Sequence, residues 1–363
     1  MNVKSKLRSG ALTVLDAVGV NRVLRSMHSR EVRIFALHGV ADFSAPSKWK
    51  PLRPQMDVNV FRNCMKMLTK QFQFVSMSRA IELLAADRPV PRNIAVVTFD
   101  DGYQNNFSQA LPVLREFNVP AVFYVATDHI EYRLPFWFDR LDFAIQAAAR
   151  RGLTINFMDR KYEMKAANRE RLKAYYAEMR ARAKIGIRNE SEFVRTLDHL
   201  ASDLEESTGE SLASHLDNDP WAGIVSIATL KTATADKLVE IGSHTCSHQR
   251  LSCAVHDERV RELEESKRKI EDWTNAECRH FAYPNGEFDS ESCELVARTG
   301  YKSGVTTVHG TNAAGSDAFR LKRLNVPYNK SLAEYSARAS GLDVLPGRLL
   351  KRERAGGDAR QRT

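Results

Sequence analysis

The chain has 363 residues and a formal net charge of +9, with 43% hydrophobic and 27% charged residues. This is the composition of a globular protein with a large core, and it is compatible with one large domain or two. No nucleic-acid-reading motif accompanies the basic residues, so no nucleic-acid partner is expected, and no apolar run reaches the ~20 residues of a membrane-spanning helix. Five cysteines without a CxxC pair argue against a disulfide framework, so we expect a cytoplasmic protein.

Residues 1–31 predict a basic amphipathic helix, with apolar side chains on one face at Leu12, Leu15, Val18, Val23 and Leu24. Asp16 interrupts the apolar run and no small-residue cleavage pattern follows it, so the segment lacks the features of a secretory signal. We expect this helix to pack on the domain that follows. The alternative is peripheral contact with the anionic inner face of the membrane, which the basic residues at both ends of the chain favour.

Between residues 32 and 330, apolar runs of strand length alternate with segments of helical periodicity. Strands are expected at 32–38, 93–99, 121–125, 238–242, 281–283 and 304–308, and helices at 57–70, 78–86, 109–117, 258–273 and 291–298. Nearly continuous apolar runs such as 93–99 are typical of parallel strands that are covered on both faces. The repeated units therefore predict an α/β domain with a parallel sheet, either open or closed into a barrel.

Residues from about 135 to 235 differ from this pattern because they are rich in Arg, Glu, Ala and Lys. A helical run at 168–184 predicts a helical insertion, which is either a cover over the site or an ordinary peripheral bundle. The aromatic residues of Pro135-Phe-Trp-Phe138 can stack on sugar rings or anchor the insertion in the core, and we favour the anchor. Residues 331–363 are expected to form a C-terminal extension that ends in a basic, disordered tail.

Two adjacent carboxylates, Asp100 and Asp101, follow the apolar run 93–99 directly and precede Gly102. They repel each other, and this costs free energy unless they share a cation or a proton. Active sites of parallel α/β domains form at the carboxyl ends of the strands, where this pair lies. Asp-Gly is also a common turn former, so the pair alone does not establish a site.

Two histidines, His244 and His248, lie four residues apart after the strand expected at 238–242. On a helical turn this spacing would direct both imidazoles toward one ion, and one added carboxylate would complete a zinc site that stays open to water. Cys246 lies between them and is expected to point into the core. Downstream, the segment 281–286 reads as a strand and a Pro-Gly turn, which can present backbone N–H groups to a developing oxyanion.

Three segments, in their order and separation, resemble the motifs of the polysaccharide deacetylases, the NodB-type enzymes of carbohydrate esterase family 4. They are Thr98-Phe-Asp-Asp-Gly-Tyr103, His244-Thr-Cys-Ser-His248 and Phe281-Ala-Tyr-Pro-Asn-Gly286. The resemblance covers residues 32–330 and implies a distorted (β/α) barrel of about seven strands. It also implies a hydrolase that removes the N-acetyl group from an amino sugar in a polysaccharide, oligosaccharide or glycolipid precursor. The implied cofactor is a divalent metal, most simply Zn²⁺, with Co²⁺, Ni²⁺ or Mn²⁺ as alternatives.

The resemblance gives each matching residue a role. Asp100 matches the general base, Asp101, His244 and His248 match the metal ligands, and the backbone N–H of Asn285 would hold the oxyanion. The base would take a proton from water, the resulting hydroxide would attack the acetamide carbonyl, and a general acid would protonate the leaving amine.

The chain departs from the family pattern in two places. Many relatives have an Arg that orients the base, and here that position is Ala282. Arg279, Arg320 or Arg323 can substitute for it, and we favour Arg323. The usual leucine-rich motif that carries the acidic His is not visible, and His38 and His309, which each end an expected strand, are the candidates for the general acid.

Two other functions fit the same residues. The same chemistry permits release of a formyl or another small acyl group from a sugar amine. A noncatalytic glycan-binding relative would keep the fold, but loss of activity usually removes a ligand or the base, and all four are present. We therefore expect an N-acetylated carbohydrate to be the substrate.

Overall fold

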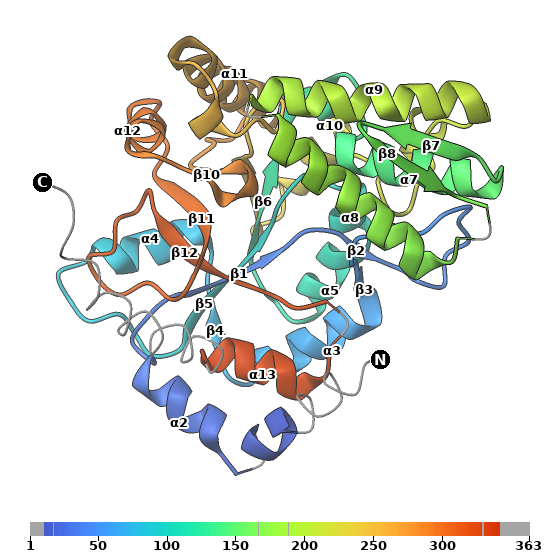
Figure 1. Cartoon of the computed structure of the whole chain (residues 1–363). Helices are drawn as coiled ribbons and strands as arrows, with labels where there is room; N and C mark the ends of the chain where they lie inside the picture. Colours follow the sequence, from blue (N-terminus) through green and yellow to red (C-terminus); the bar gives the residue numbers. More distant parts are fainter. Residues whose placement is uncertain (1–10, 17, 166, 188, 329, 342–363) are drawn as a thin grey trace, which may run out of the picture.

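The central feature of the fold is a barrel of parallel strands (Figure 1). In a computed structural model, which describes all residues except 1–10, 17, 166, 188, 329 and 342–363, eight strands follow the order β1-β12-β11-β10-β9-β6-β5-β4. The sheet closes because β1 (Arg33–Leu37) pairs with both β12 (Leu321–Asn325) and β5 (Ile94–Phe99). The others are β4 (Gln73–Phe74), β6 (Ala121–Val125), β9 (Val239–Ser243), β10 (His280–Ala282) and β11 (Ser303–His309). Seven strands thus form the predicted (β/α) barrel, and β4 is added to it beside β5.

Helices surround this barrel, as the alternation in the sequence predicts. They include α3 (Val58–Leu68), α4 (Met77–Ala85), α5 (Leu111–Glu116), α6 (Thr127–Glu131), α10 (Ile227–Ala233), α11 (His256–Thr274) and α12 (Ser290–Arg298). The carboxylate of Asp57 caps α3 by accepting hydrogen bonds from two backbone N–H groups of its first turn. A π-helical segment, η1 (Asn106–Ala110), precedes α5, so the helix expected at 109–117 begins earlier and with wider winding.

The strands are buried on both faces, which explains their continuous apolar sequences. On β5, Val97 and Phe99 belong to the large cluster that the surrounding helices share. Val96 belongs to a separate cluster with side chains of β1, β6, β10, β11 and β12. Because side chains alternate along a strand, Thr98 and Asp100 lie on the same face as Val96. The strand direction therefore directs Asp100 toward the barrel interior.

The insertion between β6 and β9 has a core of its own. It contains α7 (Trp137–Arg150), α8 (Arg169–Gly186) and α9 (Glu190–Thr208), so its predicted helical character is confirmed. An antiparallel hairpin of β7 (Thr154–Phe157) and β8 (Arg160–Glu163), which the sequence analysis did not predict, also belongs to it. In Figure 1 the three helices lie together on one side of the barrel.

The two ends of the described chain pack against each other. Helix α2 (Val20–Met27) contacts α13 (Leu332–Ser340), and α13 also contacts α3. The buried Asn21 amide donates to Asp16 Oδ1 at 2.7 Å and to Ser336 Oγ at 3.3 Å, so Asp16 anchors the segment whose apolar run it interrupts. The N-terminal helix thus packs on α13 of the C-terminal extension, and α13 in turn packs on α3 of the barrel domain. The basic tail lies outside the described residues. Within the described part of the chain, no helix combines the length and hydropathy that crossing a membrane requires.

Candidate metal site and active site

The two adjacent carboxylates lie at the carboxyl end of β5 and are almost fully buried. Asp101 has a left-handed backbone with φ 76°, and Gly102 continues it with φ 79°. This turn lets the two side chains point in different directions. Asp100 continues the strand face toward the barrel interior, and Asp101 faces the histidines that follow β9.

Arg323 on β12 holds Asp100 in a bidentate ion pair. Its two terminal nitrogens donate to Asp100 Oδ1 and Oδ2, each at 2.7 Å, while its Nε donates to the Thr306 carbonyl at 2.8 Å. Burial by itself would raise the pKa of Asp100, but the Arg323 guanidinium holds that pKa well below its usual range. Asp100 is therefore ionised at neutral pH, as a base must be. Many relatives have a base-orienting arginine at the position of Ala282. Arg323, the residue that we favoured in its place, lies where it can orient Asp100.

Asp101, His244 and His248 converge on one point. Each offers one ligand atom, and these atoms all lie within 4.8 Å of one another. Asp101 Oδ1 is 3.7 Å from His244 Nε2 and 3.5 Å from His248 Nε2. The expected helical turn is wrong, because the segment is irregular and Thr245 and His248 have positive φ values of 66° and 59°. These two left-handed residues, rather than helical spacing, bring the imidazoles together, and Cys246 is buried as predicted.

The chemistry of these three side chains fits a divalent cation such as zinc. His244 Nδ1 lies 2.7 Å from the Ala282 carbonyl, so this nitrogen carries the proton and leaves Nε2 free as a ligand. Burial, and after it the neighbouring His244, lowers the pKa of His248 to about 3, which keeps this imidazole neutral. One carboxylate and two neutral imidazoles make a typical zinc donor set.

Asn285 and Gly286 of the Pro284–Gly286 turn line the same pocket, which has a volume of about 170 Å³. Asn285 and Gly286 have φ values of 57° and 70°. Gly286 donates to the Tyr283 carbonyl at 2.7 Å, and the Asn285 carbonyl accepts from Thr307 Oγ1 at 3.2 Å. The structure gives the Asn285 N–H no hydrogen-bond acceptor among the described residues, which fits the predicted oxyanion role.

The two histidine candidates for the general acid are placed differently. His38, after β1, lines the pocket, and its Nδ1 is 3.2 Å from the Tyr328 hydroxyl. His309 ends β11 but is not among the residues that line the pocket, and its Nδ1 lies 3.3 Å from Arg338. The structure therefore brings His38, and not His309, to the metal site.

The remaining wall of the pocket comes from residues that the sequence analysis missed or left open. Phe138, Tyr176 and Arg180 of the insertion line it together with Arg53. Phe136 is buried and its ring lies 5.3 Å from that of His248, so the segment at 135–138 is mainly an anchor, as favoured, while Phe138 also faces the pocket. The insertion thus borders the site. No sequence motif marks Arg53 or Arg180.

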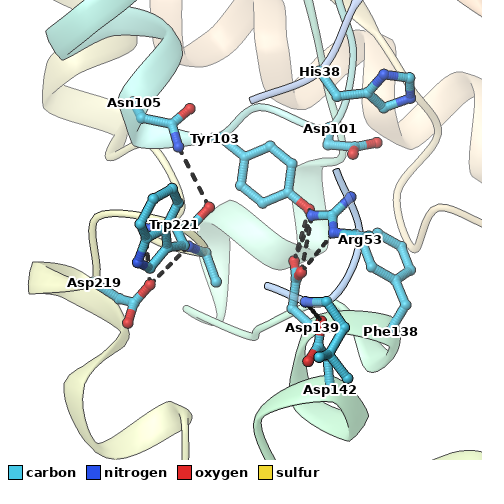
Figure 2. Close-up of polar contacts among 12 residues, drawn as sticks. His38, Arg53, Asp101, Tyr103, Asn105, Phe138, Asp139, Asp142, Asp219 and Trp221 are labelled. Carbon is cyan, nitrogen blue, oxygen red and sulfur yellow. Dashed lines mark hydrogen bonds and ion pairs between the residues drawn. The ribbon is translucent and has the colours of Figure 1, made fainter. Parts of the chain in front are cut away.

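Arg53, which lines the pocket, also belongs to a polar network with Tyr103 and Asp139 (Figure 2). It pairs with Asp139, 2.8 Å away, and also hydrogen-bonds the Tyr103 hydroxyl. Tyr103 donates to Asp139 Oδ2 at 2.7 Å, and the Arg53 guanidinium lies 4.7 Å from the Phe138 ring centre. The last residue of the Thr-Phe-Asp-Asp-Gly-Tyr motif therefore connects the barrel to the first helix of the insertion, where Asp139 lies.

Comparison with known proteins gives the same family as these motifs. The family model for polysaccharide deacetylase matches residues 87–175 and 218–304. The poly-beta-1,6-N-acetyl-D-glucosamine N-deacetylase of Escherichia coli (strain K12) is 31% identical over 86 residues, which make up 23% of this chain and 12% of that protein. The chain spans 36% or less of the length of the curated relatives that it matches.

Solved structures share the fold. The Streptococcus pyogenes deacetylase PplD, solved in complex with acetate, is 17% identical with a TM-score of 0.55, over 86% of this chain and 99% of that chain. IcaB from Ammonifex degensii is 16% identical with a TM-score of 0.53, over 86% of this chain and 98% of that chain. The residues between the two family-matched segments contain most of α8 and all of α9. From its motifs, its barrel and this match, the chain belongs to the polysaccharide deacetylase family.

Proposed function

We propose that the protein is a divalent-metal-dependent hydrolase that removes the N-acetyl group from an amino sugar. The observation that carries this proposal is the convergence of Asp101, His244 and His248 within 4.8 Å beside an ionised Asp100 that Arg323 holds at 2.7 Å. The curated relative named above acts on poly-beta-1,6-N-acetyl-D-glucosamine. Oligosaccharides of that polymer are therefore the first substrates to test.

Asp101, His244 and His248 would hold the cation. When bound, a divalent cation polarises a carbonyl and lowers the pKa of water. Asp100 lies beside these ligands, and its carboxylate accepts the proton of the attacking water. Arg323 keeps Asp100 oriented, and it keeps this base ionised by opposing the effect of burial on its pKa.

The substrate carbonyl becomes an oxyanion when hydroxide attacks it. The Asn285 N–H, presented by the left-handed turn, donates a hydrogen bond to that oxygen. His38 lines the same pocket and donates a proton to the leaving nitrogen, so that acetate and a free amine are released. Tyr328, 3.2 Å from His38 Nδ1, orients this imidazole.

The test separates metal binding from catalysis. Elemental analysis of the purified protein should give about one zinc or similar ion per chain, and an Asp101→Ala, His244→Ala double variant should have none. Asp100→Asn is the matched control, because it should keep the metal and lose acetate release from β-1,6-linked N-acetylglucosamine oligosaccharides. No metal in the unaltered protein after reloading would overturn the mechanism. Metal and glycan binding without acetate or formate release would favour a noncatalytic glycan-binding protein.

We also propose that the N-terminal segment contacts an anionic membrane surface. Its exposed apolar side chains support this, since Val14, Val18, Val23 and Met27 are 61%, 69%, 62% and 72% exposed. Exposed apolar side chains next to basic residues are typical of peripheral membrane segments. The protein should sediment with phosphatidylglycerol vesicles at low salt, and a Val18→Asp, Val23→Asp variant should not. A wild-type protein that stays in the supernatant would refute the contact.

A further inference from the structure

The insertion places a second cation at the edge of the catalytic pocket. Arg180, on α8, lines this pocket together with Asp101 and both histidines. Its guanidinium carbon lies 5.4 Å from the Trp137 ring centre and 5.2 Å from that of Tyr176. Arg180 is an exposed residue, and its guanidinium rests against these two rings. Arg180 lies outside both segments that match the family, so the family comparison assigns it no role.

The aromatic rings that hold Arg180 are themselves fixed. Trp137 packs edge-on against Phe193 of α9 with ring centres 5.4 Å apart. The Tyr176 hydroxyl donates to the Phe138 carbonyl at 3.1 Å, which joins α8 to the segment that packs on His248. The guanidinium therefore has a defined place relative to the metal ligands.

Arg180 differs from the other arginine in the pocket wall by its lack of a counter-charge. Arg53 is paired with Asp139 at 2.8 Å. In the described part of the chain, no carboxylate lies within ion-pair distance of Arg180, and its guanidinium makes no hydrogen bond. The pocket carboxylates are both used, because Arg323 neutralises Asp100 and Asp101 is a ligand. With a divalent cation bound, the pocket therefore has a surplus of positive charge.

We propose that Arg180 binds an oxyanion, a phosphate or a carboxylate, that the amino sugar carries near its acetamide group. Guanidinium groups bind such planar or tetrahedral oxyanions through paired N–H donors. A neutral sugar would leave this charge without a partner in the bound complex. The inference rests on the proposed function, because it assumes that an N-acetylated sugar enters this pocket.

The test compares three monosaccharides on the zinc-loaded protein at physiological salt by calorimetry. They are N-acetylglucosamine, its 1-phosphate, and N-acetylmuramic acid, which carries a carboxylate. Arg180→Gln removes the charge and keeps a polar, hydrogen-bonding side chain. Arg171→Gln is the matched control, because Arg171 lies on the same helix, stacks on Tyr175 at 5.6 Å, and does not line the pocket.

The unaltered protein should bind at least one of the charged sugars about ten-fold more tightly than the neutral sugar, since hydrogen bonds to charged groups have this strength. Arg180→Gln should abolish this preference and Arg171→Gln should keep it. The charged sugar that is preferred identifies phosphate or carboxylate as the oxyanion. Equal affinities, no measurable binding of either charged sugar, or a preference that persists in Arg180→Gln because the metal alone attracts the anion, would overturn the proposal.

Acetate release, measured separately, distinguishes this inference from the proposed function. If no sugar yields acetate but the Arg180-dependent preference persists, the hydrolase proposal fails and the oxyanion site stands. If neutral oligosaccharides are deacetylated, and Arg180→Gln changes neither KM nor the preference for charged sugars measured by calorimetry, the hydrolase proposal stands and the oxyanion site fails.

Discussion

The ion pair between Arg323 and Asp100 makes the sharpest prediction about catalysis. Both side chains are buried, with 1% and 4% of their surfaces exposed. Arg323→Met keeps an apolar chain of similar length and leaves the Asp100 carboxylate without its partner. We expect the variant to lose both the orientation of the base and the low pKa of its carboxyl group.

The magnitude follows from the burial. Breaking a buried ion pair by removing one partner costs about 3–5 kcal/mol of unfolding free energy. At about 1.4 kcal/mol per pKa unit, the same energy raises the pKa of Asp100 by roughly 2–4 units relative to the unaltered protein. Because burial also raises this pKa, the group should move from below the usual carboxyl range to above it.

The contribution of Asp100 to the unfolding free energy should therefore depend on pH with opposite sign in Arg323→Met. The lowered pKa of Asp100 stabilises the unaltered protein above the ordinary carboxyl pKa of about 3.9, and this contribution is lost as the pH falls through the lower folded value. In Arg323→Met the folded pKa is raised, so its destabilisation relative to the unaltered protein should be larger at pH 7.5 than at pH 4.5. Urea denaturation at both pH values measures this difference.

Acetate release measured against pH gives the catalytic half of the test. The acidic limb of kcat/KM should move upward by about two pH units or more in Arg323→Met. Arg323→Lys, which keeps the charge, should move it less. An Asp100→Asn, Arg323→Met double variant should recover most of the lost stability, because no unpaired charge remains. An unchanged limb together with unchanged stability in Arg323→Met would refute the reasoning.

Three further predictions concern the rest of the site. Asp101→Asn should lower zinc affinity at least about 100-fold in competition with a chelator, and equal affinity would remove Asp101 from the ligand set. His38→Gln should lower kcat for acetate release about 100-fold or more with unchanged metal content, whereas unchanged kcat would exclude it as the acid. Gly286→Ala should lower the unfolding free energy by about 2 kcal/mol, because its Cβ would lie 2.1 Å from Thr307 Oγ1 at φ +70°. Equal stability in urea would contradict this.

The sequence predicts the barrel well because its signals are local. The nearly continuous apolar run at 93–99 becomes β5 (Ile94–Phe99), and the helix expected at 291–298 becomes α12 (Ser290–Arg298). Closure of the sheet depends on which strands pair, and a parallel pairing between distant strands leaves no local pattern. The resemblance to a family, rather than periodicity, is what decided between an open sheet and a barrel.

The candidate site divides in the same way. Asp100 and the ligand residues have short motifs, so they could be named before the structure, although the route by which His244 and His248 converge could not. His38 was a candidate because it ends an expected strand. Arg323 was expected to follow a strand, but it lies in the middle of β12. Only the pairing of β1 with β5 and β12 shows why Arg323 reaches Asp100 and why His38 lies beside the same strand end. Arg180 could not be predicted, since its position depends on how the insertion folds back over the barrel.

The closure of the barrel by its first and last strands has a consequence for synthesis of the protein. Arg323 follows Asp100 by 223 residues, and β1 needs β12 on one side to complete the ring. During translation, the chain up to about residue 310 would contain all three metal ligands and the base carboxylate, but not the guanidinium that keeps this base ionised in a buried position. A fragment that ends before β12 therefore lacks the ion pair that holds Asp100. The site on which the proposed function rests is complete only when β12 enters the barrel.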